Sequence, residues 1–78
     1  MSPHYTVRFL GWRTGLQTIP LILLIRDIAK LGLRDAKEFV ESILEGKTMC
    51  LSFNDILVAE NLRQMADDLG AVATLESS

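Results

Sequence analysis

The chain has 78 residues, of which 49% are hydrophobic and only 6% aromatic, so the composition predicts one small domain with an aliphatic core. Cys50 is the single cysteine, which excludes a disulfide framework and favours a reducing, cytoplasmic compartment. Residues 1–47 hold seven Lys or Arg and five acids, whereas residues 48–78 hold one Arg and five acids. This uneven charge predicts a basic face but excludes the strongly basic domain that is typical of nucleic-acid binding.

The first element in the chain is a predicted strand. Tyr5, Val7 and Phe9 recur at every second position, which is the period of a strand with one buried face. The sequence GWRTG at 11–15 is predicted to be a loop, because its two glycines permit turns with positive φ. Trp12 is therefore expected in a loop, where it packs locally.

A helix is predicted from about 19 to 31. Thr18 precedes it as a hydroxyl cap, and Pro20 lies in its first turn, where a missing N–H costs little. The apolar run at 19–25 is too short to span a bilayer, which needs about 20 residues. It also lies too far inside the chain for a secretory signal, so no membrane partner is expected.

The two sides of this predicted helix differ in polarity. Leu23 falls on the charged side, about 60° from Arg26 by helix geometry. A leucine among charged residues is a candidate contact residue. The apolar side is predicted to consist of Leu21, Leu24, Ile25, Ile28 and Ala29.

A second helix is predicted from about 34 to 45. Residues 31–33 form a connection so short that the two helices should lie adjacent and roughly antiparallel. Gly46 is expected to end the helix in the left-handed conformation. The i,i+4 charge pairs of this helix place the basic residue first, which is the less favourable order and is a feature of some functional surfaces. The apolar stripe is predicted to consist of Leu33, Ala36, Phe39, Val40, Ile43 and Leu44.

Two strands and a third helix complete the chain. Residues 48–53 read as a strand with Met49 and Leu51 on one face, and Cys50 is interpreted as a buried small hydrophobe. Asn54-Asp55 is predicted to cap the third helix, Gly70 to end it, and residues 71–76 to form the last strand. The third helix is predicted to bury Val58, Ala59, Leu62, Met65, Ala66 and Leu69.

This order predicts an α+β fold. The β-α-α-β-α-β succession favours a three-stranded antiparallel sheet covered on one face by three helices, since alternating strands bury a single face. We expect one domain over residues 1–78, with an ordered core at about 5–75.

No residue pattern in the chain indicates an enzyme, a metal site or a cofactor. His4 stands alone near the terminus, without the second histidine or cysteine that a zinc site requires. GWRTG lacks the spacing of a phosphate-binding loop. The acidic pairs and triplets on the predicted helices are interpreted as solvated faces, because a small domain rarely encloses the cleft that shifts a carboxyl pKa.

The feature that does indicate function is a surface. Five residues are predicted to share the outer face of the two-helix hairpin, where an apolar side chain among cations is typical of a protein-binding patch. An ordinary solvated basic face is the alternative, and both interpretations stay open. The predicted partner-binding residues are Leu23, Arg26, Lys30, Arg34 and Lys37.

The sequence LGLRDAKEFVES at 31–42 resembles a motif of the C-terminal domain of the bacterial ribosomal stalk protein. The resemblance extends over about residues 5–75 and implies the same β-α-α-β-α-β fold. It also implies that the helix hairpin is a docking surface for translational GTPases. Arg26, Arg34 and Lys37 match basic positions of that family, whereas Thr18 and Leu23 replace two others.

The second half of the chain is also similar to the ClpS-type adaptor of the Clp protease, which has the same fold. The similarity lies in EGKTMC at 45–50 and in short stretches at 58–60 and 73–76. A diverged ClpS-like adaptor with a Clp-type chaperone as partner is therefore the first alternative to a stalk-type docking domain. A structural module that forms a homodimer through Ile19 and Leu23 is the second.

Overall fold

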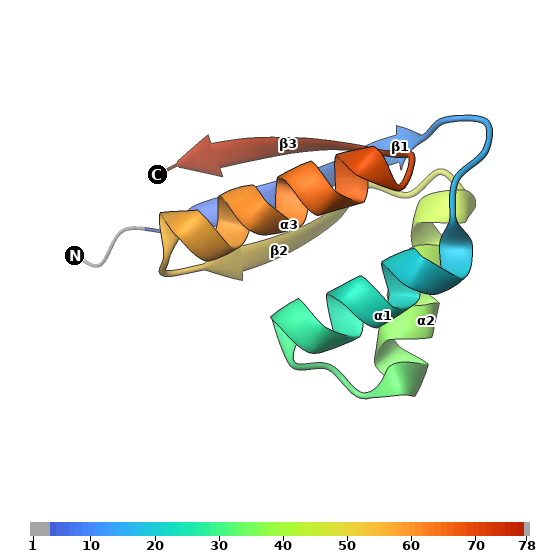
Figure 1. The fold of residues 1–78 in the computed structure, drawn as a ribbon, viewed down its shortest axis with the longest axis horizontal. Helices are drawn as coiled ribbons and strands as arrows, with labels where there is room; N and C mark the ends of the chain where they lie inside the picture. The colour runs from blue at the N-terminus through green and yellow to red at the C-terminus, as the bar shows by residue number, and fades with distance from the viewer. Residues whose placement is uncertain (1–3, 78) are drawn as a thin grey trace.

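The computed structural model describes residues 4–77 and confirms the predicted α+β fold (Figure 1). The expectation that residues 1–3 precede the ordered core lies outside the described residues. The element order is β-α-α-β-α-β, as predicted. The elements are β1 (Tyr5–Trp12), α1 (Thr18–Ala29), α2 (Leu33–Leu44), β2 (Met49–Phe53), α3 (Ile56–Asp68) and β3 (Ala71–Ser77).

The sheet has the strand order β2-β1-β3, and both strand pairs are antiparallel. Val7 lies at the centre of the core-facing side, paired with Leu51 on one neighbour and with Leu75 on the other. On the opposite side, the hydroxyl oxygens of Thr6 and Ser52 are 3.3 Å apart. This alternation leaves one side of the sheet polar and facing water.

The helices form the other layer of the domain. α3 lies along the sheet, and α1 and α2 form a hairpin beside one end of it (Figure 1). The rings of Phe9 on β1 and Phe39 on α2 pack edge to face, with centroids 5.5 Å apart, which joins the hairpin to the sheet. The buried core consists of Val7, Phe9, Leu21, Ile22, Leu24, Ile25, Ala36, Phe39, Val40, Ile43, Ala59, Leu62, Ala66 and Ala71.

The first strand is longer than predicted. Gly11 and Trp12, expected in a loop, belong to β1 and pair with Val72 and Ala71 on β3. The pairing register shifts between Phe9 and Gly11, as at a β-bulge, so the period-two pattern breaks while the strand continues. Trp12 is therefore a strand residue, and 48% of its surface is exposed.

The ends of the first helix also differ from the prediction. Thr18 is inside α1, and the N-cap is Gln17, whose side chain makes no capping hydrogen bond. The helix ends at Ala29, because Lys30 adopts the left-handed conformation with φ 59°. Leu31 lies in the connection, as predicted. Gly32 is the N-cap of α2, so Leu33, which was expected in the connection, is the first residue of α2.

The later capping predictions are confirmed. The carboxylate of Asp55 accepts a hydrogen bond of 2.8 Å from the backbone N–H of Leu57, which caps α3. Gly46 follows α2 with φ 91°, and Gly70 follows α3 with φ 104°. Both glycines occupy the left-handed region, where a Cβ atom is strained.

The prediction that Cys50 is buried is wrong. Cys50 is exposed and pairs with Arg8 on the polar side of the sheet. Met49, Leu51 and Phe53 alternate with it and pack against the core. A strand that is covered on one side must present every second residue to water, whatever its side-chain type.

None of the three helices in the described part of the chain combines the length and the apolar character that crossing a bilayer requires.

Candidate protein-docking site

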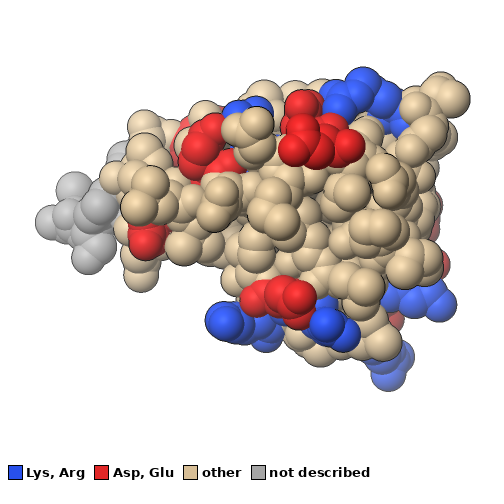
Figure 2. Space-filling view, in the orientation of Figure 1, with Lys and Arg blue, Asp and Glu red and all other residues tan. Residues whose placement is uncertain are grey.

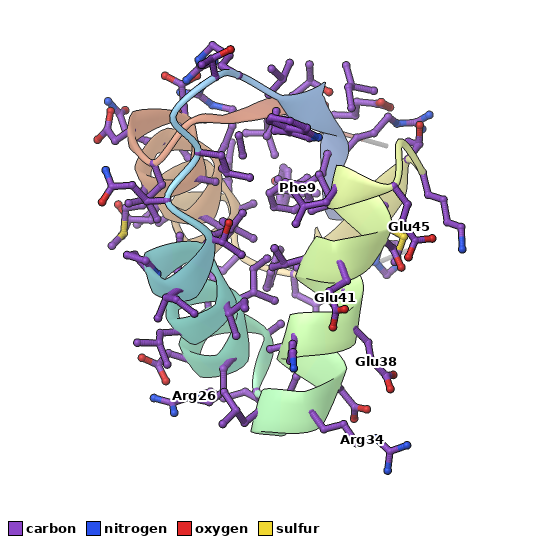
Figure 3. All side chains as sticks on the ribbon, turned by 90° about the vertical axis from the view of Figure 1, so that its right-hand side faces the viewer. Phe9, Arg26, Arg34, Glu38, Glu41 and Glu45 are labelled. Atoms are coloured by element: carbon purple, nitrogen blue, oxygen red, sulfur yellow. The ribbon has the colours of Figure 1, made fainter. Side chains whose placement is uncertain are left out.

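Four of the five predicted binding residues lie at one end of the α1–α2 hairpin. We call Arg26, Lys30, Arg34 and Lys37 the basic hairpin end. The first two belong to the last turn and C-cap of α1, and the other two to the first turns of α2. Figure 3 shows Arg26 and Arg34 at the same end of the hairpin, beside the short connection. The structure therefore places cations from both helices at one end of the hairpin, with Arg26 and Arg34 pointing to opposite sides of it.

Two of these cations have nearby carboxylates. Arg26 Nε lies 3.1 Å from Asp27 Oδ1, and Arg34 Nε lies 3.4 Å from Glu38 Oε1. The side chain of Arg34 is 90% exposed. Exposed pairs of this kind contribute only about 0.2–1 kcal/mol, so a partner's carboxylate can replace them at little cost.

The other two cations are unpaired among residues 4–77. Lys30 and Lys37 are both exposed, and no carboxylate of the described residues lies within 4.0 Å of either ammonium group. Lys37 follows Arg34 by one helical turn, which puts the two on neighbouring parts of the α2 surface. Within the described residues, the basic hairpin end thus presents two cations without a carboxylate partner and two weakly paired ones.

Leu33 adds an apolar group to this end of the hairpin. It was predicted to belong to the buried stripe of α2, but 55% of its surface is exposed. As the first residue of α2, it lies beyond the part of the helix that packs on the sheet and α1. Its exposure and its place immediately before Arg34 make it a candidate contact residue.

Leu23 occupies a different surface. It was expected on the outer face of the hairpin, but it lines an open groove between α1 and α3, of about 500 Å³. We call this surface the α1–α3 groove. The helix periodicity gave the direction of Leu23 relative to Arg26 but gave no information on the third helix that packs on that side. The groove is lined by Pro20, Leu23, Leu24, Asp27, Met65, Asp68 and Leu69.

The acidic residues of α2 lie away from the core. Figure 3 shows Glu38, Glu41 and Glu45 following one another along α2 toward solvent. Glu38 contributes its backbone carbonyl to a 3.0 Å hydrogen bond from the Ser42 hydroxyl and its carboxylate to Arg34. These residues form a solvated helix face. The connection end of the hairpin carries four cations and two carboxylates, Asp27 and Asp35, whereas the rest of α2 carries mainly acidic residues.

The resolved pKa shifts lie outside these surfaces. On α3, the Arg63 guanidinium donates a hydrogen bond of 2.6 Å to the Glu60 carboxylate. This hydrogen bond lowers the pKa of Glu60 and raises that of Arg63. Within residues 4–77, no cluster of three potential metal ligands is formed.

Taken together, the fold and the exposed side chains describe a small β-α-α-β-α-β domain with a basic and apolar end on its helix hairpin. No protein-family model matches the chain. The chain is 34% identical over 71 residues to the large ribosomal subunit protein bL12c of Cyanidium caldarium. The alignment covers 83% of this chain and 52% of that protein, so the chain spans about half the length of this relative. This similarity supports the stalk-type resemblance of residues 31–42, whereas the Clp-adaptor alternative stays a prediction.

Proposed function

We propose that the chain is a non-enzymatic protein-docking domain of the ribosomal stalk C-terminal type, which binds a partner through its first two helices. One observation carries the proposal: Lys30 and Lys37, which have no carboxylate partner within residues 4–77, lie beside the exposed Leu33 at a single end of the hairpin. The similarity to bL12c supports the same class.

The charges of this end define the chemistry of the partner. Four cations around an apolar side chain fit an acidic surface that contains an apolar pocket. The cations accelerate encounter with such a surface and orient it, while burial of Leu33 supplies a short-range anchor. A translational GTPase is the partner class that the stalk resemblance implies, and no cofactor is needed for this role.

The proposal is tested by binding to a purified translational GTPase in biolayer interferometry. Lys37→Glu reverses an unpaired cation of the basic hairpin end, and Lys47→Glu makes the same change beyond α2, near Glu45. We expect Lys37→Glu to weaken binding at least tenfold and Lys47→Glu to leave it within about twofold. Absence of binding by the unchanged chain, or equal effects of the two variants, would refute the proposal.

The two alternatives have separate tests. A ClpS-like adaptor requires binding that depends on the N-terminal residue of a peptide, so a peptide array without that dependence excludes it. Self-association through Ile19 and Leu23 requires a dimer in analytical ultracentrifugation, so a strict monomer excludes it. Ile19 is 66% exposed and Leu23 is 39% exposed, so both can take part in such a contact.

A further inference from the structure

The α1–α3 groove is an apolar surface between two acidic margins. Leu23 on α1 and Met65 on α3 both line it, 39% and 46% exposed respectively. Neither side chain belongs to the buried core, although both are large and apolar. Figure 2 shows this side of the molecule, with uncharged surface between carboxylates that lie over α3 and over α1.

The margins of the groove carry negative charge from both helices. Asp68, the last residue of α3, contributes a carboxylate that is unpaired within residues 4–77, and Asp27 on α1 contributes one that is shared with Arg26, whose Nε lies 3.1 Å from its Oδ1. The aspartates of α3 lie in its last turn, which is the negative end of the helix dipole, and that turn contains no basic residue to offset them. Asp67 is compensated by Arg13, whose Nη1 lies 3.1 Å from its carboxylate. Among the described residues, Asp68 has no such partner within 4.0 Å.

From this charge pattern we infer that the α1–α3 groove binds a basic amphipathic helix of a partner protein. A groove between two helices accommodates the apolar stripe of a third, with anchors at i and i+3 or i+4. Lys or Arg residues beside those anchors would meet Asp27 and Asp68. This site goes beyond the proposed function, because its charge is opposite to that of the basic hairpin end and it must select a different partner surface.

The spacing of the lining residues supports a helical occupant. Pro20, Leu23, Leu24 and Asp27 stand at i, i+3, i+4 and i+7 on α1, so they form one continuous ridge. Met65, Asp68 and Leu69 repeat the same spacing over one turn of α3. Each wall places its carboxylate one turn after an apolar residue, and because α1 and α3 run in opposite directions (Figure 1), Asp27 and Asp68 lie toward opposite ends of the groove, which matches a ligand whose apolar anchors are flanked by cations.

The test uses a phage-displayed library of helical peptides selected against the purified chain. We expect the enriched peptides to carry two apolar residues one turn apart, flanked by Lys or Arg. A synthetic peptide of the enriched sequence, labelled with fluorescein, then gives dissociation constants by anisotropy. Asp68→Lys should weaken binding at least tenfold, and Met65→Ser about fivefold or more. Glu41→Lys, the matched charge reversal on α2, should leave binding unchanged.

Several outcomes would overturn the inference. These are enrichment of acidic peptides, equal binding by Asp68→Lys and Glu41→Lys, or a synthetic peptide whose affinity survives replacement of its Lys residues by Glu. A dimer of the unchanged chain that Asp68→Lys abolishes would assign the groove to a second copy instead. A failure of the proposed function can be told apart from a failure of this inference, because the two surfaces are separate. Lys37→Glu, which changes only the basic hairpin end, should retain full peptide binding.

Discussion

Replacement of Gly70 by alanine tests how the turn after α3 is held against the start of α1. Gly70 has φ 104°, and its carbonyl accepts a hydrogen bond of 2.8 Å from the Arg13 N–H. The neighbouring carbonyl of Leu69 accepts one of 2.9 Å from Gln17. A Cβ atom at Gly70 would lie 2.9 Å from the Cα of Leu16, closer than real Cβ contacts. Since the hydrogen bonds fix both segments, the backbone of Leu16 cannot move away freely.

The expected loss of stability combines two costs and one offsetting gain. An L-residue in the left-handed region costs about 1–2 kcal/mol, and the lower entropy of the unfolded alanine chain offsets about 0.4–1 kcal/mol of that. Overpacking against Leu16 adds about 1–3 kcal/mol. We therefore expect Gly70→Ala to lower the free energy of unfolding by about 2–4 kcal/mol, which corresponds to a fall in Tm of at least about 8 °C.

Gly15→Ala and Gly46→Ala are the matched controls. These glycines have φ 92° and 91°, and nothing lies within 4 Å of the Cβ that each would gain. They should lose only about 1 kcal/mol each. Urea unfolding followed by far-UV circular dichroism and by the fluorescence of Trp12 measures all three. Equal losses at the three glycines would refute the argument that Leu16 makes Gly70 special.

The other predictions concern single side chains. Asp55→Ala removes the cap of α3 and should cost about 1 kcal/mol in urea unfolding, whereas a loss below about 0.3 kcal/mol would contradict the capping role. Cys50 should react with a thiol reagent in the folded protein at a rate near that of an unfolded control; protection until unfolding would contradict its exposure. Arg63→Met should raise the pKa of Glu60 in an NMR titration, because the guanidinium hydrogen bond lowers it. A carboxyl group whose pKa is lower in the folded state stabilises the fold at pH values above its unfolded pKa, and this stabilisation is lost as the pH falls through the folded pKa. The unchanged chain should therefore lose more stability than Arg63→Met on acidification. Identical pH profiles of the two proteins would contradict this.

The local signals in the sequence were sufficient for the fold. The elements and their order were identified from three signals: the period of two in β1, the helical spacing of apolar residues in the segments after it, and the cap at Asp55. Gly46 and Gly70 marked two helix ends correctly, because a positive φ is a local requirement. The extension of β1 through Gly11 and Trp12 was missed, since it depends on pairing with β3, about 60 residues away along the chain.

The candidate site was predictable only in part. The basic hairpin end follows from the position of its residues at the two ends of a short connection. The place of Leu23 could not be predicted in this way. A helix projection gives the direction of a side chain but not the element that packs in that direction, which for Leu23 is α3. Cys50 is a different kind of error: its alternation with Met49 and Leu51 places it on the opposite side of β2, and this strand geometry outweighs the general preference of cysteine for burial.

The strand order β2-β1-β3 has a consequence for folding during translation. The strand synthesised first is the central one, and both of its partners come later in the chain. A nascent chain that has reached only Gly70 can pair one edge of β1, while the edge that receives β3 stays open. We therefore expect this domain to complete its fold only after the last strand has left the ribosomal exit tunnel. Until then β1 presents an unpaired edge that neighbouring nascent chains or chaperones can bind.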